Sequence, residues 1–112
     1  MRKTGSDRGN LCLLKMVETG KRLLATLESN DLEAVQETAK SFSQAVNDAW
    51  QVYQQGEIPT QMRGQAFPRM MYQFATTELP VAIVDPQRWP AIVREMRNFI
   101  NMINIVAPQV GE

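Results

Sequence analysis

The stretch that decides the fold is Asn30–Gly56, NDLEAVQETAKSFSQAVNDAWQVYQQG. Its apolar residues recur at alternating steps of three and four, which places them on one face of an α-helix. They are Leu32, Val35, Ala39, Phe42, Val46, Ala49 and Tyr53. Asn30 is predicted to be the N-cap, with Glu33 completing a capping box, and Gly56 ends the helix. A long amphipathic helix is therefore the clearest prediction from this sequence.

A second helix is predicted immediately before this stretch. The apolar residues between positions 11 and 27 also cluster at steps of three and four. Because only about two residues join the two helices, they should form an antiparallel helical hairpin over residues 11–56. Gly20 lies inside the first helix, where glycine costs about 1 kcal/mol relative to alanine. Close packing against a neighbouring helix is the favoured explanation for this glycine, and a hinge is the alternative.

The rest of the chain divides into three parts. Residues 1–10 read as a flexible basic arm, because they contain three basic residues, two glycines and no periodicity. Residues 57–89 contain four of the six prolines and are predicted to be a connection with one short helix from Pro68 to about Glu78. Within it, the run LPVAIVDP is either a buried extended segment or a short helical turn. A last helix is predicted over residues 90–107, with Pro90 in its first turn. The expected fold is a single all-α domain over residues 11–112, packed as a small bundle.

Composition excludes several classes of protein. The 112 residues carry 12 basic and 12 acidic side chains, so the formal net charge is zero. Without histidine and with Cys12 as the only cysteine, imidazole or thiolate metal sites and Ser-His or Cys-His nucleophile pairs are ruled out. There is no apolar run long enough to span a membrane and no signal-peptide core, so a cytoplasmic location is expected.

No catalytic constellation is evident, so the chain is not expected to be an enzyme. Glu33 and Glu37 lie one turn apart, as glutamates do in helical metal-dependent pyrophosphohydrolases, but the second acidic cluster of such a site is missing. A solvated helix face is the favoured interpretation of this pair. Cys12 lies in an apolar stripe and is interpreted as a small core residue. We expect no metal, cofactor or small-molecule substrate.

The last predicted helix contains the run NFINMINIV, residues 98–106. Its main apolar face is opposed by three asparagines, but two apolar residues fall on the asparagine side. This second face, together with the tryptophan just before the helix, is a candidate contact with another subunit. The candidate residues are Trp89, Asn98, Asn101, Met102, Asn104 and Ile105. A partly solvated face with two stray apolar residues is the alternative.

Basic residues give a second candidate surface. All five basic residues after position 57 are arginines, and four of them, with the N-terminal arm, could contact phosphates as a strip. The candidate phosphate contacts are Arg2, Lys3, Arg8, Arg63, Arg69, Arg94 and Arg97. Ordinary surface arginines, some of them paired with Glu78 or Glu95, are the competing interpretation.

The sequence therefore favours a non-enzymatic interaction or assembly subunit of a larger complex. It would contact a protein partner, or a second copy of itself, through its C-terminal half. The alternative is a small nucleic-acid-contacting subunit of a ribonucleoprotein effector or a phage packaging complex, which would use the arginine strip and the basic arm. That alternative rests on size and helicity alone.

Overall fold

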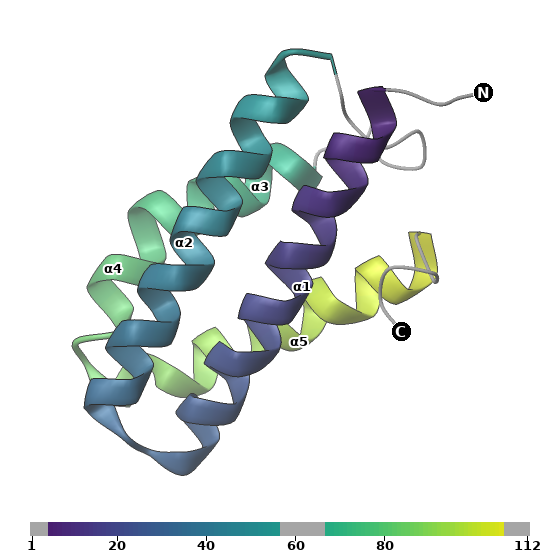
Figure 1. Ribbon diagram of the computed structural model, residues 1–112. Helices are drawn as coiled ribbons and strands as arrows, with labels where there is room; N and C mark the ends of the chain where they lie inside the picture. The colour runs from purple at the N-terminus through teal and green to yellow at the C-terminus, as the bar shows by residue number, and fades with distance from the viewer. Residues whose placement is uncertain (1–4, 57–66, 107–112) are drawn as a thin grey trace.

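The computed structural model describes residues 5–56 and 67–106, and every element in these ranges is helical (Figure 1). The first two elements are the long helices α1 (Gly5–Ser29) and α2 (Leu32–Gln54). The third is built from α3 (Phe67–Gln73), the π-helix η2 (Phe74–Glu78) and α4 (Leu79–Ala82), which follow one another without a break. The 3₁₀-helix η3 (Pro86–Arg88) leads directly into α5 (Trp89–Val106). The predicted all-α bundle, built on a helical hairpin and closed by a C-terminal helix, is confirmed.

The hairpin forms as predicted, but the turn between its helices uses different residues. Asn30 has a positive φ of 59°, a left-handed conformation that asparagine tolerates better than most residues. It therefore ends α1, and the predicted N-cap at Asn30 is wrong. The N-cap of α2 is Asp31, whose carboxylate accepts a hydrogen bond from the backbone N–H of Ala34 at 3.2 Å. Glu33 is consequently not in the capping-box position.

The predicted stripe of α2 faces the core. Six of its seven residues are buried, and only Leu32, at the first turn, is exposed. The buried residues of α1 meet this stripe, and the hydroxyl groups of Thr26 and Thr38 share an interhelical hydrogen bond of 2.8 Å. The α1–α2 pair is therefore held mainly by apolar burial, which is the dominant favourable contribution to folding.

Helix α5 packs against α1 at Gly20. A Cβ atom at this position would lie 2.9 Å from Cε of Met96 and 3.4 Å from ring atoms of both Phe42 and Phe99. The rings of Phe42 and Phe99 meet edge to face, with centroids 5.8 Å apart. Gly20 thus allows α5 to approach α1 closely, in agreement with the packing explanation and not with a hinge.

Two boundaries differ from those predicted. Helix α1 begins at Gly5, so residues 5–10 are helical where a flexible arm was predicted; residues 1–4 lie outside the described ranges. The helix predicted from Pro68 to about Glu78 instead continues to Ala82. The run LPVAIVDP is therefore helical in its first half and forms a turn in its second.

The π-helix η2 allows the third element to pass through Pro80. Proline has no N–H and its ring clashes with the carbonyl four residues earlier, so it normally breaks a helix. Here the turn before it is widened, and the N–H of Leu79 bonds to the carbonyl of Phe74, five residues back. The hydroxyl of Thr77 donates to the carbonyl of Gln73 at 2.6 Å. This element packs on α2, where the rings of Trp50 and Tyr72 stack with centroids 5.1 Å apart.

Tyr53 is buried, and no hydrogen-bond partner for its hydroxyl is found among the described residues. Burial, aided by the neighbouring Cys12, raises the pKa of this phenol well above its usual value. In the unfolded chain the same phenol ionises near pH 10. We therefore expect the free energy of unfolding to fall by about 1.4 kcal/mol per pH unit above pH 10, because only the unfolded state releases the proton there.

Replacement of this residue, Tyr53→Phe, should remove that part of the pH dependence and leave the protein at least as stable at pH 7, since no bonded hydroxyl is lost. Urea unfolding of both proteins, at neutral pH and above pH 10, measures the difference. Parallel pH profiles for the two proteins would contradict the assignment.

Candidate functional site

Helix α5 has one buried and one exposed face. Ile92, Met96, Phe99 and Ile103 are buried in the core. Asn98, Asn101 and Asn104 are exposed, as the sequence predicted. Two large apolar side chains are exposed with them, because Met102 is 40% and Ile105 is 79% accessible to solvent. Five of the six candidate contact residues therefore lie on the surface of one helix.

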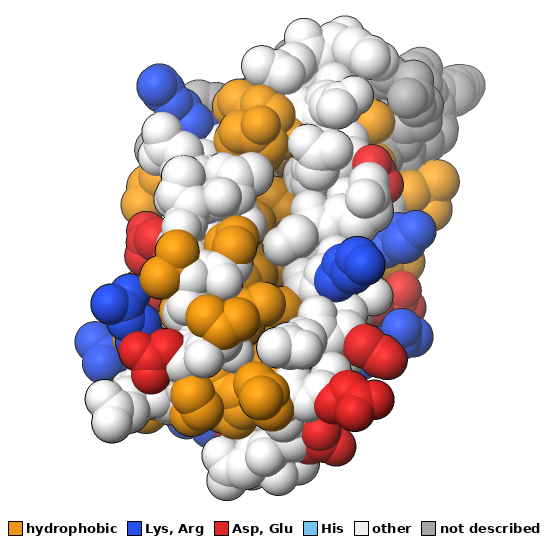
Figure 2. All heavy atoms as spheres, turned by 90° about the vertical axis from the view of Figure 1, so that its left-hand side faces the viewer, with side chains coloured by type: hydrophobic (Ala, Val, Ile, Leu, Met, Phe, Trp, Pro, Cys, Tyr) orange, Lys and Arg blue, Asp and Glu red, His pale blue; other side chains and the backbone are white. Residues whose placement is uncertain are grey.

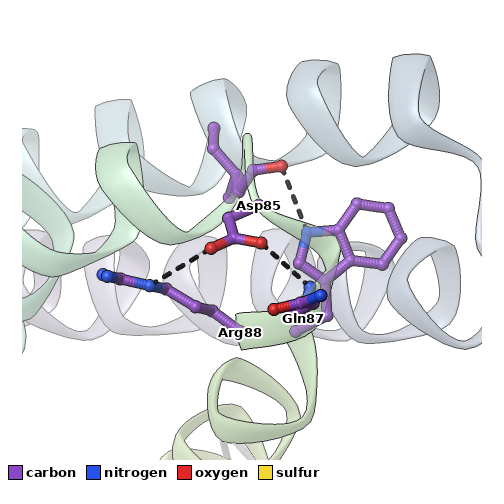
Figure 3. A network of polar contacts seen from close by, with 5 residues as sticks. Asp85, Gln87 and Arg88 are labelled. Atoms are coloured by element: carbon purple, nitrogen blue, oxygen red, sulfur yellow. Dashed lines mark hydrogen bonds and ion pairs between the residues drawn. The ribbon is translucent and has the colours of Figure 1, made fainter.

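The sixth candidate, Trp89, is not on this surface. Its side chain is 5% exposed, and its indole Nε1 donates a hydrogen bond to the backbone carbonyl of Ile83 at 3.1 Å. The turn before it is fixed by Asp85, which accepts from the backbone N–H of Gln87 at 3.2 Å and pairs with Arg88 at 3.4 Å (Figure 3). Trp89 closes the core at the start of α5, and its prediction as a contact residue is corrected.

The structure describes three of the seven predicted phosphate contacts. Arg69 and Arg94 are exposed. Nη2 of Arg97 lies 2.6 Å from a carboxylate oxygen of Glu28 on α1, so this arginine pairs with neither Glu78 nor Glu95. The side chains of Arg2, Lys3, Arg8 and Arg63 lie outside the described part of the structure. A phosphate at Arg97 would have to displace an existing carboxylate partner.

A groove runs between the third helical element and α5. It contains two adjoining hollows of about 430 and 520 Å³, which share Phe74, Glu78 and Glu95 as lining residues. Met70, Met71 and Met102 line the first hollow. Val81, Ala82 and Ala91 line the second. The groove is thus mainly apolar, with two exposed carboxylates near its middle, and the side chain of Met102 belongs to it.

A second apolar surface lies between α2 and α4. Figure 2 shows apolar side chains running down the middle of this side of the molecule, with charged side chains at both margins. A groove of about 380 Å³ is lined here by Ala39, Leu79, Pro80, Ile83 and Val84, among others. The sequence analysis missed this surface. Its signal was the apolar run LPVAIVDP, in which Pro80, Ile83 and Val84 line this groove.

The acidic and cysteine side chains of the described residues do not form a cluster of metal ligands. In the ranges 5–56 and 67–106, no three acidic, cysteine or histidine side chains gather closely enough to hold a metal ion. Glu33 and Glu37 are both exposed on α2, and Cys12 is half-buried against the core. Within the same ranges, no helix has the length and apolar content needed to cross a membrane.

No protein family model, curated protein or solved structure matches this chain. The surface features described above are therefore the basis for a functional assignment.

Proposed function

We propose that this protein is a non-enzymatic helical subunit that assembles into a larger complex through its C-terminal half. The observation that carries the proposal is the exposure of Met102 and Ile105 on α5, where Met102 lines an apolar groove. Single exposed apolar side chains are ordinary on a protein surface. Here two of them lie on one helix, and Met102 lines a groove that also contains exposed Met70. Clustered apolar surface of this kind is typical of interaction sites.

The residue types support protein contact over nucleic-acid contact. Methionine side chains adapt to varied partners, and asparagine amides both donate and accept hydrogen bonds. The groove holds the carboxylates of Glu78 and Glu95, which would repel a phosphate backbone. Of the described arginines proposed to contact phosphate, Arg97 is already paired with Glu28. We therefore place a protein partner first and nucleic acid second.

The proposal is tested by affinity capture with the immobilised full chain in extract from its native source. We expect captured proteins to be retained by wild type and reduced roughly tenfold or more by Ile105→Glu, since a charge would be buried at the contact. Leu11→Glu is the matched control, because Leu11 is an apolar residue of α1 that is 66% exposed. Loss of the same proteins from both variants, or capture of none by wild type, would refute the proposal.

A further inference from the structure

Three residues on the exposed side of α5 are spaced one heptad apart: Ala91, Asn98 and Ile105. Residues seven apart on a helix lie within about 20° of one another around its axis. All three side chains are exposed, so they form one continuous seam on the outside of the bundle. In order along the helix, the seam carries a small residue, a polar amide and a large apolar residue.

From this order we infer that α5 pairs with α5 of a second copy of the chain, antiparallel and about a two-fold axis at Asn98. This inference rests on the proposed function and names the partner. A two-fold axis through Asn98 places Ile105 of each copy opposite Ala91 of the other, so the largest seam residue meets the smallest at both ends. A parallel pair would instead place isoleucine on isoleucine and alanine on alanine. Self-complementarity of one surface patch is the condition for a two-fold dimer.

The polar residue of the seam and those on one flank of it match in the same register. At the centre, Asn98 meets its own copy, and two amides can donate to and accept from each other. A buried asparagine in the seam of a helix pair is also a recognised device for fixing register. On one flank, Arg94 and Asn101 lie one turn before and one turn after the centre. The two-fold axis brings equivalent flanks of the two α5 helices together. The Arg94 guanidinium of one copy therefore faces the Asn101 side-chain carbonyl oxygen of the other.

The groove gives Ile105 of the second copy an apolar surface to cover. Ala91 lies on the wall of the hollow of about 520 Å³, beside Val81 and Ala82. An isoleucine arriving opposite Ala91 therefore reaches a hollow whose apolar lining includes Val81 and Ala82, with Gln87, Arg88 and Glu95 at its polar part. Neither α5 nor the groove has to rearrange for this contact, since the exposed residues and the hollow are both present in the single chain.

Charge and size set the expected strength of the dimer. Because the net charge of the chain is zero, two copies do not repel each other at long range. One helix per copy gives a contact at or below about 1,200 Å², the low end for specific interfaces. We therefore expect a dimer that dissociates on dilution.

The first test is sedimentation equilibrium of the full chain over a roughly hundredfold range of concentration, because a weak dimer shows itself as a concentration-dependent mass. Ile105→Ala should weaken association roughly tenfold because it leaves a gap opposite Ala91. Ala91→Ile should weaken it by a similar factor because it crowds one isoleucine against another. The double variant, Ala91→Ile with Ile105→Ala, should restore it, because it exchanges the large and small partners. Val84→Ala is the matched control: Val84 is 62% exposed, between α2 and α4.

The second test measures the position of the two-fold axis. In a Cys12→Ala background, Asn98→Cys should cross-link to a covalent dimer under a mild oxidant, since equivalent residues at the axis are within disulfide reach. Asn104→Cys is the control, because Asn104 is exposed on the same helix but outside the seam. Circular dichroism checks that every variant is folded.

Three outcomes would overturn the inference: a monomer at all concentrations, a double variant that stays weak, or equal cross-linking at positions 98 and 104. A monomeric chain that still captures other proteins through Ile105 would refute the second copy as partner while leaving the proposed function standing. A chain that neither self-associates nor captures any protein refutes both.

Discussion

Gly20→Leu is expected to destabilise the protein by about 3 kcal/mol or more, the upper end of the cost of overpacking a core. A Cβ at this position already lies 2.9 Å from Cε of Met96, and the ring atoms of Phe42 and Phe99 are 3.4 Å away. The further carbons of leucine have no space unless α5 moves away from α1. Since small domains are stable by about 5–15 kcal/mol, this is a large fraction of the total.

Gly20→Ala is the matched control and separates crowding from helix propensity. The single added methyl displaces only the flexible end of Met96, and alanine favours the helix by about 1 kcal/mol over glycine. These two effects oppose each other, so we expect a change within about 1 kcal/mol of wild type. Urea unfolding followed by circular dichroism gives all three stabilities. If the leucine variant were as stable as wild type, α5 could not be packed against Gly20 as described.

Phe42→Ala is expected to cost about 3–5 kcal/mol, the range measured for truncating a buried phenylalanine. Its side chain is 0% exposed and contacts α5 through the edge-to-face pair with Phe99. Truncation removes this pair and leaves a cavity where α1, α2 and α5 meet, because the ring of Phe42 also borders Gly20.

Phe42→Leu serves as the control, since it keeps most of the volume and loses the aromatic pair, worth about 0.5–1.5 kcal/mol beyond its area. Thermal and urea unfolding of both variants separates the cavity from the pair. A cost below about 1 kcal/mol for the alanine variant would mean that Phe42 is not at the centre of the core.

The hairpin and the last helix could be predicted because their periodicity is long and regular. The apolar stripe from Val35 to Tyr53 repeats over three heptads. Its burial fixes which side of α2 packs on the core. The N-cap could not be placed as well, because Asn30 and Asp31 are adjacent and both are good caps. Only the backbone decides between them, and the positive φ of Asn30 assigns it to the end of α1.

The third helical element was harder to predict, because the usual effect of proline on a helix is overcome there by the structure around Pro80. Prolines normally end helices, and Pro80 therefore suggested a break. The widened turn of η2 and packing against α2 keep the helix intact instead. The exposure of Val84 beside the second groove could not be foreseen while this segment was undecided between a buried extended segment and a short helical turn.

The exposure of the candidate contact residues was predicted nearly in full, with one exception that has a clear cause. Helical geometry alone places Asn98, Met102 and Ile105 away from the buried face of α5, so their exposure follows from spacing. Trp89 lies at the helix start, where the direction of the side chain depends on the turn before it. That turn brings the Ile83 carbonyl to the indole, which no sequence pattern indicated.

The close contact of α5 with Gly20 also bears on the order in which the protein is made. Contacts between neighbours in sequence form with the smallest loss of chain entropy, so we expect the α1–α2 hairpin to form first during synthesis. Until α5 leaves the ribosome, the apolar channel along Gly20 and Phe42 has nothing to cover it. Ribosome-bound chains, in which α5 has not yet emerged, should therefore expose this channel to chaperones, and released chains should not.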